Sequence, residues 1–213
     1  MSEKTRVNTI IQRLEKEYPH SHIALKYSSP LELLIATILS AQSTDVMVNK
    51  ITPQLFQRYK NVEEYANSEI KELEEQIRSS GFFHQKARSI QAAARKIQTE
   101  YGGKVPDTMD ELVKLPGVAR KTANVVLYNA FGKTEGIAVD THVRRLSRLL
   151  GLSSHNDPDK IEKDLMQLVP KHEWGRFTYL LIEHGRNICI ARRPKCGQCV
   201  LKDICPSAFA AQP

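Results

Sequence analysis

The chain has 213 residues, and its 31 lysines and arginines exceed its 24 aspartates and glutamates, which gives a net charge of +7 and an isoelectric point near 9.2. This length allows a full hydrophobic core in one or two domains, and the positive balance suits a polyanionic partner such as nucleic acid or an acidic membrane. The sequence has neither an apolar run of about 18 residues nor a signal-like N-terminus, so a membrane-spanning helix is excluded and a soluble intracellular protein is expected.

Helical periodicity runs through the sequence, and alternating β-branched runs are almost absent, so we predict an all-α fold. Prolines and small polar residues mark the helix starts. The segment that begins at Pro30 is strongly apolar yet too short to cross a bilayer, and we interpret it as the buried centre of a helical bundle. The first predicted helices cover residues 5–18, 30–39, about 44–59 and 68–77, with Ser43 or Thr44 and Ser68 as caps.

Two loops next to these helices carry residues of interest. Gln42 lies at the turn between the second and third predicted helices, where the plain interpretation is a solvated loop residue. Further along, Gly81, Phe82 and Phe83 precede a long helix that runs towards Tyr101. Two adjacent aromatic side chains on a loop cannot both face one core, so one of them is expected to be exposed. Packing of Phe82 into the core is the alternative.

A tight turn is expected to join two short helices in the middle of the chain. The first opens at Asp107 and ends at Leu115-Pro-Gly117, because proline lacks an amide proton and glycine accepts a positive φ. The amides around Gly117, Val118 and Ala119 are expected to be unpaired at the positive end of the second helix. Such a helix start forms an anion site that fits a phosphate.

Lys121 lies in the first turn of that second helix, next to Arg120. A lysine amine is a nucleophile only when it is neutral, and both the helix dipole and Arg120 disfavour the ammonium form. Burial in a cleft would act in the same direction. The residues alone leave two interpretations open, a nucleophile or a contact to a DNA phosphate, and of these the phosphate contact is the commoner use of a basic residue in such a turn.

Asp140 precedes Thr141-His-Val-Arg-Arg145, a pattern that predicts a helix N-cap with a glycine stop at Gly151. A carboxylate beside a reacting sugar can also stabilise positive charge and accept a proton from an attacking amine. Capping and catalysis are compatible. A site shared by Asp140 and Lys121 requires the loop over residues 132–139 to fold back.

Two further helices complete the prediction, one that starts at Asp157-Pro158 and one over residues 174–187. The aromatic and leucine residues of the second have helical spacing and are interpreted as core, and His184 is interpreted as structural. The sequence contains no repeats, low-complexity runs or polar linkers. Any second domain is therefore expected to be interleaved with the first.

Four cysteines lie close together with the spacing Cys-x6-Cys-x2-Cys-x5-Cys. In an intracellular protein such clustering indicates a metal rather than disulfides. Thiolate chemistry alone favours structural zinc over an iron–sulfur cluster. Several cations surround the cysteines, and a metal-pinned loop that carries them is suited to binding phosphates. The cysteines are Cys189, Cys196, Cys199 and Cys205, and the cations are Arg186, Arg192, Arg193, Lys195 and Lys202.

These motifs together resemble the endonuclease III family of helix-hairpin-helix DNA glycosylases, and the resemblance covers nearly the full length of the chain. It rests on the hairpin Leu115-Pro-Gly-Val-Ala-Arg-Lys121, on Val139-Asp-Thr-His142 and on the cysteine intervals, of which the last are the most specific. The loop over residues 132–139 departs from the family, which usually has a proline there and a slightly shorter loop.

The resemblance implies two all-α lobes. A six-helix barrel that contains the hairpin is expected over residues 23–133, and a discontinuous domain with the cysteine loop is expected over residues 1–22 and 134–213. DNA would lie across the cleft, with Lys121 on one wall and Asp140 on the other. The cysteine intervals imply a four-iron, four-sulfur cluster in place of zinc, with a structural role.

The resemblance also implies roles for single residues. Lys121 would attack the sugar C1′, expel the damaged base and form a Schiff base, while Asp140 would stabilise charge and take the proton. Gln42 matches a glutamine that enters the duplex where the damaged base leaves, and Phe82 stands where the family commonly has a leucine wedge. The other expected DNA contacts are Gly117, Ala119, Arg120, Arg192 and Arg193.

The implied activity is that of a bifunctional DNA glycosylase and AP lyase of base excision repair, which removes oxidised pyrimidines and nicks the strand by β-elimination. The partner would be double-stranded DNA with a damaged base or an abasic site, and we expect a monomer in the cytoplasm or at the nucleoid. Two alternatives stay open. One is a monofunctional mismatch glycosylase, against which Lys121 and Asp140-Thr-His142 argue, and the other is a non-catalytic DNA-binding module.

Overall fold

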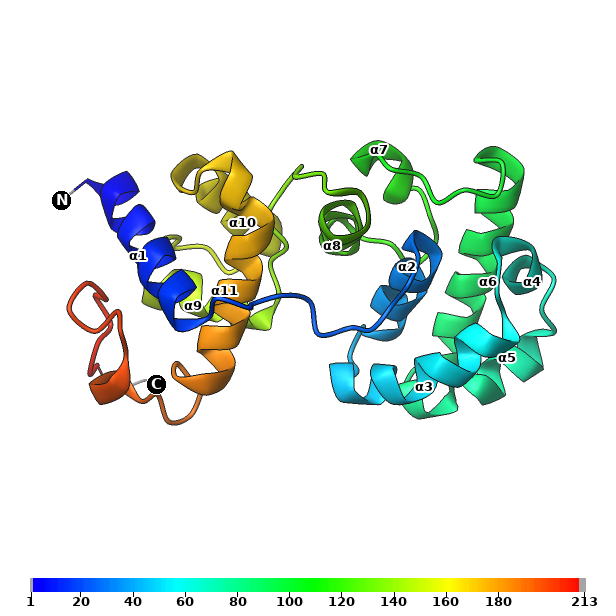
Figure 1. Ribbon diagram of the computed structural model, residues 1–213, viewed down its shortest axis with the longest axis horizontal. Coiled ribbons are helices and arrows are strands. Elements are labelled where there is room, and N and C mark those ends of the chain that lie inside the picture. The colour runs from blue at the N-terminus through cyan, green and yellow to red at the C-terminus, as the bar shows by residue number, and fades with distance from the viewer. Residues whose placement is uncertain (1, 211–213) are drawn as a thin grey trace. The chain divides into compact units, whose positions relative to one another are not determined.

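The computed structural model describes residues 2–210, and every regular element in that range is helical (Figure 1), which confirms the all-α prediction. Contacts divide the chain into two compact units. Unit 1 is formed by Met1–Ile23 and Gly136–Pro213, and unit 2 by Ala24–Glu135. Unit 2 is thus inserted in the sequence of unit 1. Among the described residues, no helix combines the length and the apolar character that crossing a membrane requires.

Unit 2 is centred on helix α2 (Pro30–Leu39), in which every residue from Leu33 to Leu39 is buried. Ser29 caps this helix, since its Oγ accepts the Glu32 amide at 3.2 Å, and the Glu32 carboxylate in turn accepts the Ser28 amide at 2.6 Å. The other elements of unit 2 are α3 (Asp45–Arg58), α4 (Val62–Ala66), α5 (Ile70–Gln76), the 3-10 helix η1 (Arg78–Ser80), α6 (Phe83–Glu100), α7 (Met109–Leu112) and α8 (Arg120–Phe131). Helix α2 packs against α3, α6 and α8.

The long helix α6 lies beside α4 and α5 (Figure 1). The sequence does not predict α4, which has only five residues and starts where Asn61 Oδ1 accepts the Glu64 amide at 2.9 Å. The predicted cap at Ser68 is wrong. Helix α5 begins after Glu69, and the Ser68 hydroxyl instead donates to the Tyr65 carbonyl at 2.8 Å. The difference at Ser68 shifts a helix boundary, whereas the missed helix α4 places Val62, Tyr65 and Ala66 in the core of unit 2.

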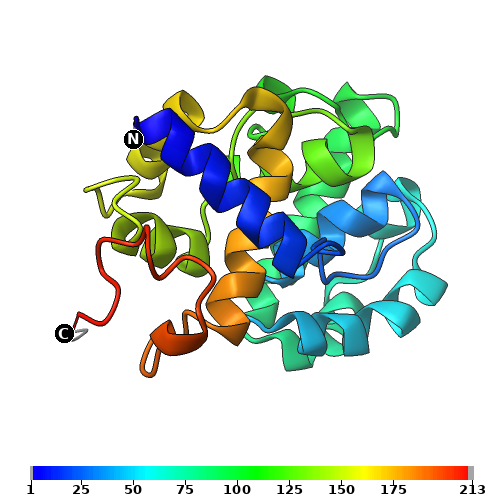
Figure 2. The same ribbon diagram turned by 60° about the vertical axis from the view of Figure 1, so that its left-hand side comes forward.

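Unit 1 joins the beginning of the chain to its second half. Helix α1 starts two residues before the prediction, because Ser2 Oγ accepts the Thr5 amide at 3.2 Å. Its apolar face, which includes Val7 and Leu14, packs against α11 and α10, and Figure 2 shows α1 crossing α11. The elements of unit 1 are α1 (Glu3–Glu17), α9 (Thr141–Leu149), α10 (Pro158–Leu168), the 3-10 helix η2 (Lys171–Glu173), α11 (Trp174–Asn187) and the 3-10 helix η3 (Cys196–Gln198).

Candidate functional site

The hairpin between α7 and α8 requires glycine at position 117. Gly117 has φ of +79°, and a Cβ built there would lie 2.8 Å from the Ser89 Cβ, so any side chain would collide with α6. One prediction about this turn is wrong. The Val118 amide is paired, because it donates to the Leu115 carbonyl at 3.1 Å. Within residues 2–210 the amides of Gly117 and Ala119 have no acceptor, so these two, and not three, can bind an anion.

Lys121 is exposed in the first turn of α8, and Arg120 beside it is exposed as well. The amine is therefore accessible, and it lies at the positive end of the α8 dipole. Ala119 is the N-cap residue and offers no side-chain acceptor, and the first turn contains no acidic residue. The start of α8 is thus an open, positive helix end with an accessible primary amine.

Asp140 is the N-cap of α9, as predicted. Its Oδ1 accepts the Val143 amide at 2.8 Å, and its Oδ2 lies 3.2 Å from His142 Nδ1. The side chain is 18% exposed, so solvent or a ligand still reaches the carboxylate. Asp140 belongs to unit 1 and Lys121 to unit 2. That the two share one site stays a prediction.

Gln42 and Phe82 are both exposed and both adopt the left-handed backbone region, with φ of 53° and 50°. Such values are uncommon for residues other than glycine, and bulky side chains adopt them at a cost of about 1–3 kcal/mol. Phe82 is 65% exposed whereas Phe83 is half-buried, so the alternative of Phe82 in the core is wrong. In both loops a strained backbone therefore carries a side chain that faces the solvent.

Lys86 is a residue that the sequence analysis missed. It is only 5% exposed, and its Nζ donates to the Leu39 and Ser80 carbonyls, each at 2.7 Å. Burial lowers the pKa of Lys86. The available signal was its position on the apolar face of α6, one residue before Ala87 and four before Ile90, because a lysine on that face is buried with its charge.

The four cysteines are half-buried free thiols that line one cavity, together with apolar residues of α9 and α11. Burial raises the pKa of Cys189 to about 11 and also raises the pKa of Cys199 and Cys205, so a bound cation is needed to hold them as thiolates. In the described part of the chain no three His, Cys, Asp or Glu side chains are grouped closely enough to hold one metal ion.

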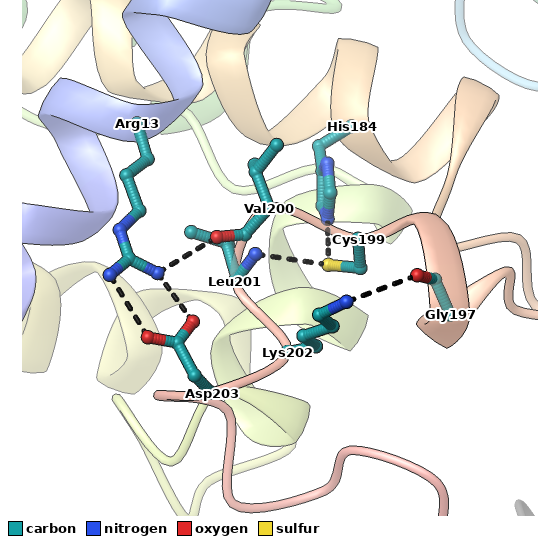
Figure 3. Close-up of polar contacts among 8 residues, drawn as sticks. All are labelled: Arg13, His184, Gly197, Cys199, Val200, Leu201, Lys202 and Asp203. Carbon is teal, nitrogen blue, oxygen red and sulfur yellow. Dashed lines mark hydrogen bonds and ion pairs between the residues drawn. The ribbon is translucent and has the colours of Figure 1, made fainter.

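His184 connects the cysteine loop to the core of unit 1 (Figure 3). Its Nε2 lies 3.4 Å from the Cys199 sulfur, and its Nδ1 lies 3.2 Å from the Tyr18 hydroxyl. Burial lowers the pKa of His184 to about 4, so the ring is neutral and carries one proton. If Tyr18 donates to Nδ1, that proton is on Nε2 and points at the sulfur. The Leu201 amide also donates to the Cys199 sulfur, at 3.4 Å.

Helix α1 reaches the same loop through Arg13. Its guanidinium donates to the Val200 carbonyl at 2.9 Å and forms an ion pair with Asp203 (Figure 3). Arg192 and Arg193, on the segment between Cys189 and Cys196, are exposed as a phosphate contact requires. A further basic hollow on unit 1 escaped the sequence analysis. It is lined by Arg144, Arg145 and Arg148 of α9 together with uncharged polar and apolar residues and the acidic Glu3.

Two family models match the chain. Residues 35–171 match the HhH-GPD superfamily of base excision DNA repair proteins. Residues 189–205, which span the four cysteines, match the iron–sulfur binding domain of endonuclease III. Together the two matches include the hairpin, the Asp140 segment and the cysteine loop.

Similar proteins are found both among curated sequences and among solved structures. Endonuclease III of Synechocystis sp. is 53% identical over 210 residues, which are 99% of this chain and 96% of that protein. A trapped covalent intermediate of endonuclease III with DNA, an estranged-adenine complex, matches with a TM-score of 0.92 and 43% identity over 98% of both chains. A thermostable thymine-DNA glycosylase matches with a TM-score of 0.80 and 28% identity over 98% of this chain and 97% of its own.

Proposed function

The chain belongs to the endonuclease III family of base excision repair proteins and is a DNA glycosylase and AP lyase; from this premise we propose which residues carry out its reaction on double-stranded DNA. The main support for the proposal is that Lys121 presents an exposed amine at an open helix start. This amine can account for a covalent step of the kind seen in a protein 43% identical to this chain, which forms a covalent intermediate with DNA. We assign the covalent step to Lys121.

In the proposed reaction the damaged nucleotide leaves the helix stack, and neutral Lys121 Nζ attacks the sugar C1′. The bond from C1′ to the base breaks, the base departs with the electron pair, and Asp140 takes the proton from the attacking nitrogen. The C1′–O4′ bond then breaks as the nitrogen lone pair forms an iminium ion between C1′ and Nζ, and O4′ takes the proton from Asp140. Loss of a C2′ proton then breaks the bond from C3′ to the phosphate oxygen, which nicks the strand on the 3′ side, and water releases Lys121.

The carboxylate of Asp140 has a second use in this scheme. Positive charge develops on the sugar while the base departs, and a fixed negative group nearby lowers the energy of that state. Because the Val143 amide and the His142 ring hold both carboxylate oxygens, the group keeps its orientation. The scheme requires that Asp140 and Lys121 meet around the bound sugar.

DNA binding is assigned to groups that match the charges and shapes of a duplex. The amides of Gly117 and Ala119 and the Arg120 side chain would bind phosphates at the start of α8, and Arg192 and Arg193 would bind phosphates at the cysteine loop. The exposed side chains of Gln42 and Phe82 would fill the gap that the displaced nucleotide leaves. These two contacts would offset the loss of stacking, which costs a few kcal/mol.

The chain carries an iron–sulfur cluster as its cofactor. We assign it to Cys189, Cys196, Cys199 and Cys205 as a four-iron, four-sulfur cluster. When bound, the cluster supplies four bonds that close the loop and convert raised-pKa thiols to thiolates. The residues around it then hold Arg192 and Arg193 at fixed positions for phosphate binding.

We propose oxidised pyrimidines as the damaged bases. The competing activity is that of a monofunctional mismatch glycosylase, because a thymine-DNA glycosylase has a similar fold. A monofunctional enzyme uses no amine nucleophile, and Lys121 supplies an accessible amine at the start of α8, which supports the bifunctional reaction. The non-catalytic alternative is wrong for a member of this family.

The test is borohydride trapping on three duplexes, which carry thymine glycol, an abasic site or a mismatched uracil. We expect a covalent adduct with thymine glycol and with the abasic site. The variant Lys121→Ala should give no adduct and no nick, while its affinity for DNA falls by less than about tenfold, the effect of one lost phosphate contact. Lys114→Ala, an exposed lysine of the same hairpin, is the matched control and should react normally.

The other outcomes have definite meanings. Trapping only at the abasic site would contradict the proposed substrate class but would still support the lyase activity. Base release from any duplex without an adduct would show a monofunctional enzyme. Normal nicking by Lys121→Ala would assign the nucleophile elsewhere.

A further inference from the structure

The buried lysine of α6 links two parts of unit 2 that are far apart in sequence. Lys86 Nζ donates to the carbonyl of Leu39, the last residue of α2, and to the carbonyl of Ser80, the last residue of η1. Leu39 lies three residues before Gln42, and Ser80 lies two residues before Phe82. One ammonium group therefore fixes the backbone that leads into both exposed loops.

Burying the ammonium group of Lys86 costs free energy, so a role that an apolar side chain could not fill is expected. Lys86 forms no ion pair with any described residue, so carbonyl oxygens alone replace the water that it loses. The Leu39 carbonyl lies in the last turn of α2, where the negative end of the helix dipole favours a cation. An apolar residue of the same length would fill the space without the desolvation cost. What it could not do is hold the two carbonyls together.

The two loops are also the places where the backbone is strained. Among residues 2–210 the non-glycine residues with positive φ are Gln42, Phe82 and Phe209, and two of these three follow the carbonyls that Lys86 binds. Strained conformations persist only where the surrounding structure over-determines them. The hydrogen bonds of Lys86 supply such a constraint at the start of both loops.

We propose that Lys86 is a positioning residue that holds the Gln42 loop and the Phe82 loop at a fixed separation, so that both side chains enter the duplex together. The inference rests on the DNA contacts proposed above for Gln42 and Phe82. In this proposal Lys86 preorganises the side chains of Gln42 and Phe82 for DNA binding. Opening a base step is unfavourable, and two groups already fixed in place offset that cost without a further loss of conformational freedom.

The variant Lys86→Met tests the proposal, because methionine has a similar length and no donor. Lys96→Met on the same helix, which removes an exposed ion pair with Glu100, is the matched control. The rate of reaction with thymine glycol in a duplex should fall by about tenfold or more in Lys86→Met, as expected for misplaced contact groups. Cleavage at an abasic site in a single strand needs Lys121 but no opening of base pairs, and should change by less than about twofold. A purely structural defect would lower both rates by the same fraction.

Single substitutions of the two loop residues complete the test. In the presence of Lys86, Gln42→Ala and Phe82→Ala should slow the duplex reaction, and their effects should not be additive. In the Lys86→Met background the two effects should become additive, because the loops then move independently. Lys86→Gln, which keeps one donor in the pocket, should give an intermediate loss and serves as the test if Lys86→Met does not fold.

Two results would separate the inference from its premise. If neither Gln42→Ala nor Phe82→Ala slows the duplex reaction, the proposed DNA contacts are wrong. If both slow it while Lys86→Met and Lys86→Gln behave like Lys96→Met, or if the Lys86 variants lose both reactions equally, the positioning role is overturned.

Discussion

At the scale of single residues, Asp140 combines a local structural role with a proposed chemical one. Its Oδ1 caps α9 and its Oδ2 faces His142, so the same group that starts the helix is held in a defined orientation. The cap needs only an acceptor oxygen, whereas the reaction needs a negative charge. The two roles can therefore be separated by substitution.

Asp140→Asn should keep the cap and lose the charge. We expect its melting temperature to stay within about 2 °C of the original, while base release slows by about a hundredfold or more. Asp140→Ala should slow the reaction similarly and also lose about 1 kcal/mol of unfolding free energy with the cap. Thermal melts and single-turnover kinetics measure the two effects. Unchanged base release by Asp140→Asn would remove the carboxylate from the mechanism.

His184 permits a second test at this scale. His184→Leu removes the ring nitrogen that lies 3.4 Å from the Cys199 sulfur and leaves the Tyr18 hydroxyl without its partner, so the cluster should be lost about tenfold faster under an oxidant. His184→Gln keeps an amide donor and should lie closer to the original. Visible absorbance and iron content follow the loss. Equal cluster lifetimes in all three proteins would show that the hydrogen bond has no effect on the cluster.

Residue roles differ in how far the sequence predicts them. Asp140 as a cap follows from neighbouring residues, and the four cysteines follow from their intervals. The burial of Lys86 follows from its place on the apolar face of α6, but its partners could not be predicted, because they are two backbone carbonyls brought together only by the packing of α2, η1 and α6. The pairing of the Val118 amide is likewise a property of the folded turn. A role that depends on the type and spacing of side chains can be predicted from the sequence. A role that depends on backbone groups brought together by folding cannot.

At the scale of secondary-structure elements, helix starts that carry a proline are well predicted. Helices α2 and α10 begin at Pro30 and Pro158, as expected, because proline acts on the first turn alone. Helix α4 was missed, since five residues are too few for periodicity to show. The hairpin turn was expected from proline and glycine, yet the contact that makes glycine necessary comes from Ser89 of α6.

That contact leads to a prediction for the hairpin. Gly117→Ala combines a positive φ with a Cβ that lies 2.8 Å from the Ser89 Cβ, so unfolding free energy should fall by about 3 kcal/mol. Gly132→Ala, at the end of α8, is the matched control. Gly132 also has a positive φ, of +65°, but open space around it, so about 1 kcal/mol should be lost. Denaturant titrations compare the two, and equal losses would mean that the packing against α6 is unimportant.

At the scale of the whole molecule, the cysteine loop holds distant parts of unit 1 together. Arg13 of α1 and His184 of α11 both contact the loop (Figure 3), so the loop connects α1 to α11. Unit 2 contributes none of these contacts. Its core is complete within Ala24–Glu135.

Loss of the cluster should therefore affect the two units differently. Cys199→Ser should lose its brown colour and much of its soluble yield, and amide exchange should become faster in α1, α9 and α11. Helices α2, α6 and α8 of unit 2 should keep their protection. Hydrogen exchange followed by mass spectrometry measures both sets. Full activity of Cys199→Ser without iron would contradict the role given to the cluster.

The insertion of unit 2 into the sequence of unit 1 also orders events on the ribosome. Helix α1 leaves the exit tunnel early, but its partners α10 and α11 are made only after the whole of unit 2. At about 5–20 residues per second this delay is on the order of ten seconds. During that time α1 has no native partner for Val7 and Leu14, whereas unit 2 already has every residue of its own core. The four cysteines follow all these elements in the sequence, so the cluster can bind only after α1, unit 2 and α11 have been synthesised.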